Sequence, residues 1–320
     1  MKMKNKGDIM KEYCFGIDVG GTTVKLGLFN QNGDILDKWE IPTRTEDNGK
    51  NILPDVAKAL EKKLQERNIP KDDVIGAGIG VPGPVDDNGV VHRAVNLGWD
   101  VFNISEVLGS LTGLPVKAGN DANVAALGEL WKGGGQGYKS IVMVTLGTGV
   151  GGGVIINGKI LSGCSGAGGE IGHIHIVDDE EDSCGCGNHG CLEQYASATG
   201  IVRLAHRRLQ SVTEPTVLKD SEVSAKSVFD AVKAGDAVAI QIAEEFGLYL
   251  GKGLAAVASV VNPEAFVIGG GVSKAGDILF SFIEKNYKKY VFHGSRDAKF
   301  ELATLGNDAG ICGAAKLLLD

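Results

Sequence analysis

One structural unit occurs twice in this chain, and the duplication limits the possible folds more than any other feature. The first copy opens with a short apolar strand, Cys14 to Val19, which ends in the loop Gly20-Gly21-Thr22-Thr23. Two more strands, Val24 to Phe29 and Ile35 to Ile41, are joined at Asn32-Gly33, a dipeptide typical of hairpin turns. The first copy is therefore a strand, a Gly/Thr loop and a hairpin.

The second copy repeats this order further along the chain. An apolar strand, Ile141 to Leu146, runs into the glycine-rich loop that begins Gly147-Thr148-Gly149. Two short strands, Val154 to Ile156 and Lys159 to Leu161, then meet at Asn157-Gly158. Because a repeated unit of this size implies repeated structure, the sequence predicts a duplicated α/β fold with two similar lobes.

Segments with helical periodicity fill the gaps between the strands. Helices are predicted near 51–67, over Ala122 to Trp131 and over about 237–260. A last helix is predicted from Ala309 to Leu319, with Asn307-Asp308 as its cap.

These elements predict two lobes with a cleft between them. The small lobe is expected to comprise residues 1–118, and the C-terminal helix of about 306–320 is expected to pack back on it. The large lobe, residues 119–305, contains the cysteine-rich segment. No low-complexity linker separates the lobes, so a compact hinge near residue 118 is expected.

Composition excludes several classes of protein. The formal net charge of -8 argues against general nucleic-acid binding. No apolar run reaches the length of a membrane helix, and residues 1–12 are charged and lack the apolar core of a signal peptide. We therefore expect residues 1–12 to form a loose tail and the protein to be cytoplasmic, without a membrane partner.

The glycine loops predict phosphate binding. A strand that opens into Gly and Thr residues exposes backbone N–H groups, which form nests for anions. The chain has two such loops in duplicated positions and a third at Gly269-Gly270-Gly271. None is followed by the Gly-Lys-Ser/Thr of a Walker motif, and the strand after each duplicated loop replaces the helix that a Rossmann fingerprint requires.

Two acidic positions are candidates for the chemistry, one beside the first loop and one at the lobe junction. Asp18 ends the first strand, where a carboxylate suits hydrated Mg²⁺ on a nucleotide phosphate, or only shapes the turn. Asn120-Asp121 precedes a predicted helix at the lobe junction, and either residue is also a good helix N-cap.

A histidine and three cysteines within about twenty residues predict a structural zinc site, because this ligand set is typical of closed tetrahedral zinc centres. The alternatives are a disulfide or buried thiols, but a Cys-Gly-Cys sequence is too tight for an easy disulfide. The acidic run Asp178 to Asp182 before the cysteines is interpreted as a solvated loop, with divalent-ion binding as the alternative. Two glutamates flank the set, so the metal would fix a loop that holds two carboxylates. The residues are His173, Cys184, Cys186 and Cys191, flanked by Glu170 and Glu193.

Together these motifs resemble the repressor–ORF–kinase (ROK) family of sugar kinases, in particular its ATP-dependent bacterial kinases for glucose. The resemblance runs from about Tyr13 to the C-terminus and implies an actin-like, ribonuclease H-like duplicated fold. The residues that carry it are Asp18-Val-Gly-Gly-Thr-Thr-Val-Lys25, Val81-Pro-Gly-Pro84, Asn96-Leu-Gly-Trp99, Asn120-Asp-Ala-Asn123, Leu146-Gly-Thr-Gly-Val-Gly-Gly-Gly153, Glu170-Ile-Gly-His173, Cys184-Gly-Cys186 with Cys191-Leu-Glu193, and Gly269-Gly-Gly271.

The resemblance also implies individual roles. Asp121 matches the general base, and Gly83 matches a backbone contact to the sugar. His173 is favoured over His175 as the zinc ligand only by the resemblance, because both have the same strand parity. The groups that match sugar ligands are Asn120, Asp121, Glu170, His173 and Glu193, the zinc ligands are His173, Cys184, Cys186 and Cys191, and the nucleotide-binding positions are Asp18, Gly20, Gly21, Thr22, Thr23, Gly147, Thr148, Gly149, Gly270 and Gly271.

The activity implied is transfer of the γ-phosphoryl group of ATP, with Mg²⁺, to the 6-hydroxyl of glucose. Asp121 would accept the hydroxyl proton, and closure of the lobes would exclude water. The alternatives are a kinase for another hexose, such as N-acetylmannosamine or fructose, and a sugar-sensing repressor of the same family. Only about a dozen residues precede the first strand, too few for a repressor's DNA-binding domain. The resemblance also implies a homodimer.

Overall fold

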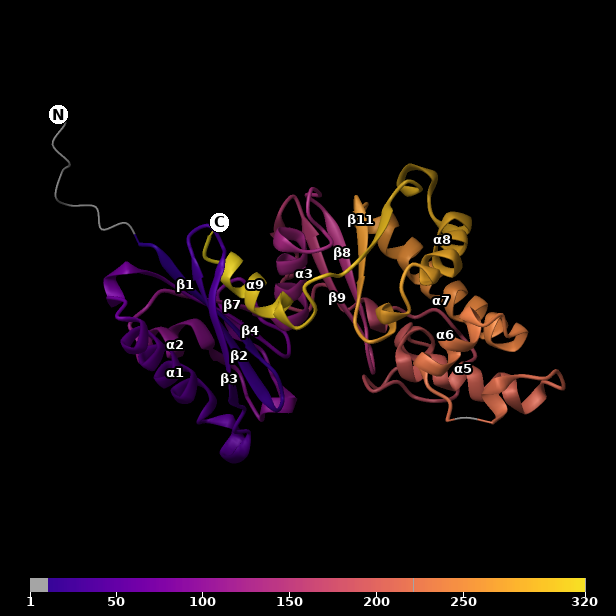
Figure 1. Ribbon diagram of the computed structural model, residues 1–320, viewed down its shortest axis with the longest axis horizontal. Helices are drawn as coiled ribbons and strands as arrows, with labels where there is room; N and C mark the ends of the chain where they lie inside the picture. Colours follow the sequence, from indigo (N-terminus) through magenta and orange to yellow (C-terminus); the bar gives the residue numbers. More distant parts are fainter. Residues whose placement is uncertain (1–10, 221, 320) are drawn as a thin grey trace. The chain divides into compact units, whose positions relative to one another are not determined.

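The computed structural model describes residues 11–220 and 222–319, so most of the predicted N-terminal tail lies outside the described residues. The chain forms two compact units (Figure 1). The first runs as far as Lys132 and also contains Ile160–Gly168 and the chain from Asn307 onward. The second contains Gly133–Lys159 and Gly169–Gly306.

The first unit is built on a five-stranded sheet in the order β3-β2-β1-β4-β7. The β1–β2 and β2–β3 pairs are antiparallel, whereas β4 and β7 add to β1 in parallel. The strands are β1 Tyr13–Val19, β2 Thr23–Asn30, β3 Ile35–Pro42, β4 Val74–Val81 and β7 Val116–Asn120, and a small separate pair comprises β5 Val90–Val91 and β6 Phe102–Asn103.

Helices cover both faces of this sheet. Two of them, α1 Ile52–Arg67 and α2 Ile104–Thr112, pack together on one face (Figure 1). The other two, α3 Asp121–Lys132 and α9 Ala309–Lys316, pack against each other and against the opposite face. The C-terminal helix α9 therefore belongs to the first unit although it follows the whole second unit in the chain.

The second unit contains a sheet in the order β10-β9-β8-β11-β12. Again one antiparallel pair, β8–β9, is extended by parallel strands, here β11 and β12. Its elements are β8 Ile141–Leu146, β9 Val150–Ile156, β10 Lys159–Ile160, α4 Glu193–Ala196, α5 Ala198–Ser211, α6 Ala225–Lys233, α7 Ala237–Val261, β11 Ala265–Gly269, α8 Ile278–Tyr290 and β12 Lys299–Leu302. The helix α7 is buried along much of its length in the core of this unit.

The matching strand order confirms the predicted duplicated α/β fold. Each copy places its first strand in the middle of a sheet, with the hairpin on one side and parallel strands on the other. One boundary differs from the prediction, because β9 begins at Val150 and not at Val154. The glycines of that stretch pair with β8, Gly152 opposite Val144, so the ladder's hydrogen bonds outweigh the low strand propensity of glycine.

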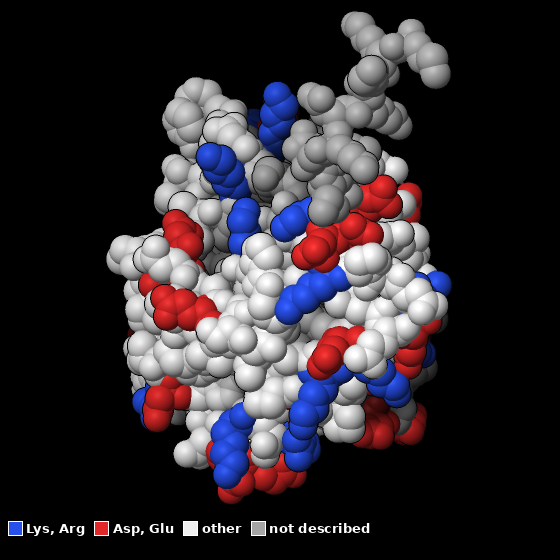
Figure 2. Space-filling view, turned by 90° about the vertical axis from the view of Figure 1, so that its left-hand side faces the viewer, with Lys and Arg blue, Asp and Glu red and all other residues white. Residues whose placement is uncertain are grey.

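Charges of both signs are interspersed on the face of the first unit shown in Figure 2. Several of them form ion pairs on the elements of that unit, such as Arg44 with Asp55 and Lys63 with Asp37. In the described part of the chain, no helix is both long and apolar enough to cross a membrane.

The closest helix packing in the first unit is between α3 and α9. A methyl carbon at Gly313 would lie 1.7 Å from the carbonyl oxygen of Val124, and one at Gly128 would lie 2.2 Å from that of Ala309. The helix backbones therefore touch, which only glycine at these positions permits. Through this contact α3 stays with the first unit, whose first segment extends to Lys132, whereas the sequence suggests a boundary near residue 118.

We expect Gly313→Ala to destabilise the first unit by about 1–3 kcal/mol, because an extra carbon in a close-packed contact forces the backbones apart. The matched control is Gly109→Ala in α2, where the added carbon would lie 3.5 Å from its nearest neighbour. That variant is expected to be neutral or stabilising, since alanine favours a helix over glycine by about 1 kcal/mol. Thermal unfolding monitored by circular dichroism compares the two, and equal midpoints would contradict the packing argument.

Candidate functional site

The predicted site residues fall into two groups, one in each unit. In the first unit, the loop after β1 closes with a hydrogen bond from the Gly20 amide to the Thr23 carbonyl, 3.0 Å. The end of β3 supports the loop, because the Thr43 hydroxyl donates to the Gly20 carbonyl at 2.7 Å and the Thr43 amide donates to Thr22. The loop carbonyls are thus held by the protein itself, which keeps the Gly/Thr loop in one shape.

Asp18 lies beside this loop, and its carboxyl group packs against the first turn of α9. A methyl carbon at Gly310 would lie 2.6 Å from Asp18 Oδ2, so glycine makes room for the carboxyl group there. Burial raises the pKa of Asp18, and Lys25, its partner across the β1–β2 pair, opposes this. A divalent cation beside the loop would stabilise the ionised form, so the residue suits a metal-binding role.

Asn120 and Asp121 stand where β7 passes into α3. The Asn120 side chain caps α3 by accepting the Asn123 amide at 3.1 Å, and its Nδ2 donates to the carbonyl oxygen of Gly83 at 3.1 Å. Asp121 Oδ1 accepts the Ala122 amide at 2.8 Å. The capping role belongs to Asn120, and Gly83 and Asn120 are brought into direct contact at the end of β4 and β7.

In the second unit, two glycine loops leave the same edge of the sheet, because β8 and β11 are parallel neighbours. The Gly147 amide donates to the Gly149 carbonyl at 3.0 Å, and the carbonyls of Gly147 and Thr148 accept from Ala198 and Thr199 at the start of α5. Gly270 has a positive φ of 84°, and a methyl carbon there would lie 2.5 Å from the Leu146 carbonyl oxygen. The loop after β11 therefore touches the end of β8, where the loop of Gly147 begins.

Glu193 connects the predicted phosphate loop at Gly147–Gly149 to the cysteine segment. Its Oε2 accepts the Val150 amide at 2.9 Å, and its Oε1 lies 3.7 Å from Cys184 Sγ. A methyl carbon at Gly149 would be 2.0 Å from Glu193 Oε2, so the carboxylate occupies the space that a side chain would take. Glycine at 149 is needed here for close approach of the Glu193 carboxylate, whatever its role in the predicted phosphate binding.

The four predicted zinc ligands are brought together by the fold. The ligand atoms of His173, Cys184, Cys186 and Cys191 all lie within 4.8 Å of one another. The Cys186 and Cys191 sulfurs are 3.7 Å apart, as are Cys184 Sγ and His173 Nδ1. Tetrahedral zinc with 2.3 Å Zn–S bonds separates its sulfur ligands by about 3.8 Å, so the residues suit zinc.

His173 presents its two ring nitrogens to different partners. Nδ1 faces the cysteines, whereas Nε2 lies 4.0 Å from the carboxylate of Glu170, a second predicted sugar ligand. His175 is engaged elsewhere, because Nδ1 meets the His189 carbonyl at 2.8 Å and Nε2 meets Asp178 at 3.0 Å. The structure therefore distinguishes His173 from His175 as the candidate zinc ligand, which their equal strand parity in the sequence does not.

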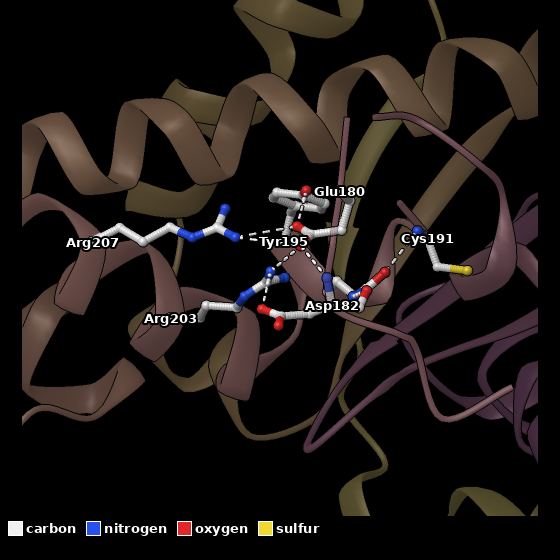
Figure 3. A network of polar contacts seen from close by, with 7 residues as sticks. Glu180, Asp182, Cys191, Tyr195, Arg203 and Arg207 are labelled. Carbon is white, nitrogen blue, oxygen red and sulfur yellow. Dashed lines mark hydrogen bonds and ion pairs between the residues drawn. The ribbon is translucent and has the colours of Figure 1, made fainter. Parts of the chain in front are cut away.

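One part of the acidic run is not the solvated loop that the sequence suggests. The side chain of Glu180 is only 2% exposed and pairs with Arg203 and Arg207 of α5, while the Tyr195 hydroxyl donates to it (Figure 3). Burial by itself would raise the pKa of Glu180, but Tyr195 and Arg203 outweigh it and bring the pKa to about 2. Sequence reasoning missed this residue because its partners lie 15 or more positions away.

Comparison with known proteins identifies close relatives along the whole chain. A glucokinase from Halalkalibacterium halodurans is 46% identical over 309 residues, which cover 95% of this chain and 94% of the relative. A glucokinase from Streptomyces coelicolor is 37% identical, with 94% of this chain and 96% of the relative covered.

Solved structures give the same result. The crystal structure of a ROK family glucokinase from Streptomyces griseus, in complex with glucose and AMPPNP, is similar with a TM-score of 0.72 and 36% identity. That match covers 95% of this chain and 98% of the other. The profile of the ROK family itself matches residues 14–320. Since the profile and the relatives match almost the full length, this chain belongs to the ROK family.

Proposed function

We propose that the protein catalyses ATP-dependent phosphorylation of glucose at the 6-hydroxyl, giving glucose 6-phosphate and ADP. The observation that supports this most is the likeness, over nearly the whole of both chains, to relatives that are glucokinases. One of the similar structures was solved with glucose and an ATP analogue bound. The local geometry agrees, because the carboxylate of Glu193, which is predicted to bind sugar, accepts a hydrogen bond from the Val150 amide just after a predicted phosphate loop.

In this proposal Asp121 is the general base. It accepts the proton of the 6-hydroxyl as that oxygen attacks the γ-phosphorus, and the bond from that phosphorus to the bridging oxygen of ADP breaks. Asn120, Glu170, His173 and Glu193 hold the other hydroxyls, and the backbone at Gly83 adds a further contact. These side chains orient the sugar, so that only one hydroxyl is presented for transfer.

The nucleotide is held by backbone amides of the three glycine loops. Asp18 is the residue that we propose for Mg²⁺, which neutralises charge on the phosphates when bound. Zinc at the Cys₃His set has a structural role, because it fixes the segment between His173 and Glu193 and directs Nε2 of the histidine away from the metal.

A homodimer is part of the proposal, and sedimentation velocity showing only monomer at assay concentration would exclude it.

A panel of hexoses tests the substrate. ADP release is measured with glucose, fructose, mannose, N-acetylmannosamine and N-acetylglucosamine at matched concentrations. We expect kcat/KM to be highest for glucose. A higher value for an N-acetylated hexose would replace glucose as the proposed substrate, and no release with any sugar would refute kinase activity.

Asp121→Asn is expected to lower turnover by about 10²- to 10⁴-fold, because the amide keeps the size of the side chain but cannot accept a proton. Glucose binding measured by calorimetry is expected to weaken much less, since the other proposed sugar ligands remain. Asp72→Asn, the same change at an exposed position of the first unit, serves as the control. If the Asp121 variant turned over glucose at the control's rate, Asp121 would not be the base.

Elemental analysis is expected to find one zinc per chain. Cys191→Ser removes a proposed ligand and is expected to lose both zinc and glucose affinity, because the segment that carries Glu193 loosens. Cys164→Ser is the matched control, since Cys164 is exposed and lies outside the ligand set. Zinc-free protein with full activity would rule out this role for the metal.

A further inference from the structure

The helix that begins at Glu193 is too short to hold its own position. It comprises Glu193–Ala196, a single turn, and a helix of this length gains too few internal hydrogen bonds to be stable without tertiary contacts. Glu193 is nevertheless fitted closely against Gly149 and Val150. Its position must therefore be fixed by contacts made by its neighbours.

The cysteine segment leads directly into this turn at its N-terminal end. Beside the turn is a hollow of about 290 Å³, lined by Cys184 and Gly185 of the cysteine segment and also by Asp182, Gln194 and Arg203. Tyr195 and Ala196 bury one face of the turn in the core of the second unit, whereas the face toward the hollow is held by polar contacts.

Those contacts come from the acidic segment. Gln194 Nε2 donates to the carbonyl oxygen of Asp182 at 2.8 Å, while its Oε1 accepts the Cys191 amide at 3.1 Å. The next residue, Tyr195, donates its hydroxyl to Glu180. Two consecutive residues after Glu193 are thus tied to the segment 180–182.

Arginines of α5 hold that segment in turn. The Arg203 guanidinium spans two carboxylates, Glu180 Oε1 at 2.5 Å and Asp182 Oδ2 at 2.8 Å, and Arg207 contacts Glu180 Oε2 at 3.2 Å (Figure 3). The Asp182 amide also donates to Glu180 Oε1 at 2.9 Å, which folds the segment on itself. Glu180 is the common acceptor, because Arg203, Arg207, Tyr195 and the Asp182 amide all meet its carboxylate.

We infer that Glu180 is a positioning residue that, through Tyr195, Gln194 and Arg203, holds the proposed sugar-binding carboxylate of Glu193 in place independently of the metal ligands. The inference rests on the proposed function for the identity of the ligand. It assigns a role to the side chain of Glu180, whose hydrogen bonds and ion pairs within the described residues are made with Asp182, Tyr195, Arg203 and Arg207 and not with the proposed sugar ligands or the cysteines.

Glu180→Gln tests the inference, because it keeps the side-chain shape and removes the charge that both arginines share. We expect KM for glucose to rise about tenfold or more, because the side chain that binds the sugar, Glu193, is no longer held in position. KM for ATP and the zinc content are expected to change little. Glu181→Gln is the matched control. It removes the same charge one residue away, at an exposed side chain, and is expected to resemble the wild type.

A second variant and a second measurement keep the outcome decisive. Arg203→Lys retains the charge but cannot span two carboxylates, so it is expected to raise KM for glucose in the same direction if Glu180→Gln fails to fold. Hydrogen exchange at the amides of residues 191–196 is expected to be faster in both variants than in the Glu181→Gln control. Unchanged KM for glucose and unchanged exchange in either folded variant would overturn the inference.

The two proposals fail in different ways. If the wild type phosphorylated no hexose, the proposed function would be refuted, but the exchange comparison would still show whether Glu180 fixes the Glu193 turn. If Glu180→Gln lost zinc together with glucose affinity, Glu180 would act through the metal site, and independence from the metal ligands would be refuted.

Discussion

The hydrogen bond from the Val150 amide to the Glu193 carboxylate is the contact on which the second unit's site depends. It joins the end of a predicted phosphate loop to a residue of the cysteine segment, two parts of the chain separated by 43 positions. The contact is possible only because residue 149 has no side chain. Predicted anion binding would by itself explain a glycine at position 149. The neighbouring carboxylate of Glu193 requires one as well, because both an anion and the carboxylate must approach the backbone closely.

Duplication explains why the site residues lie at strand ends. In both sheets the first strand of the repeat is central and is followed by a glycine loop, and parallel strands beside it end at the same edge. In the first unit this places the residues at or just after the C-terminal ends of β1, β4 and β7 close together, including Asp18, Gly83 and Asn120. In the second unit it places the loop after β11 in contact with the end of β8.

Capping shows how local signals can be right about an element and wrong about a residue. The sequence offers either Asn120 or Asp121 as the N-cap of α3. The structure assigns the cap to Asn120, whose side chain accepts the Asn123 amide. At α9, Asp308 occupies the N-cap position but makes no capping hydrogen bond, and its carboxylate instead pairs with Lys38 of β3 at 2.8 Å. Sequence spacing identifies where a helix starts, whereas the partner of a charged side chain depends on what the fold brings near it.

The sequence by itself determined the duplicated fold, the glycine loops and the Cys₃His set, because these depend on short-range patterns of periodicity, turn chemistry and ligand spacing. The tertiary structure decided which histidine faces the cysteines, since His173 and His175 differ only in the partners that the fold supplies. It also decided that Glu180 is buried and paired. A run of five consecutive acidic residues predicts a solvated loop. Two arginines and a tyrosine from later elements instead surround Glu180 and stabilise its charge away from water. Such a pairing joins residues that are distant in sequence, so no local pattern encodes it.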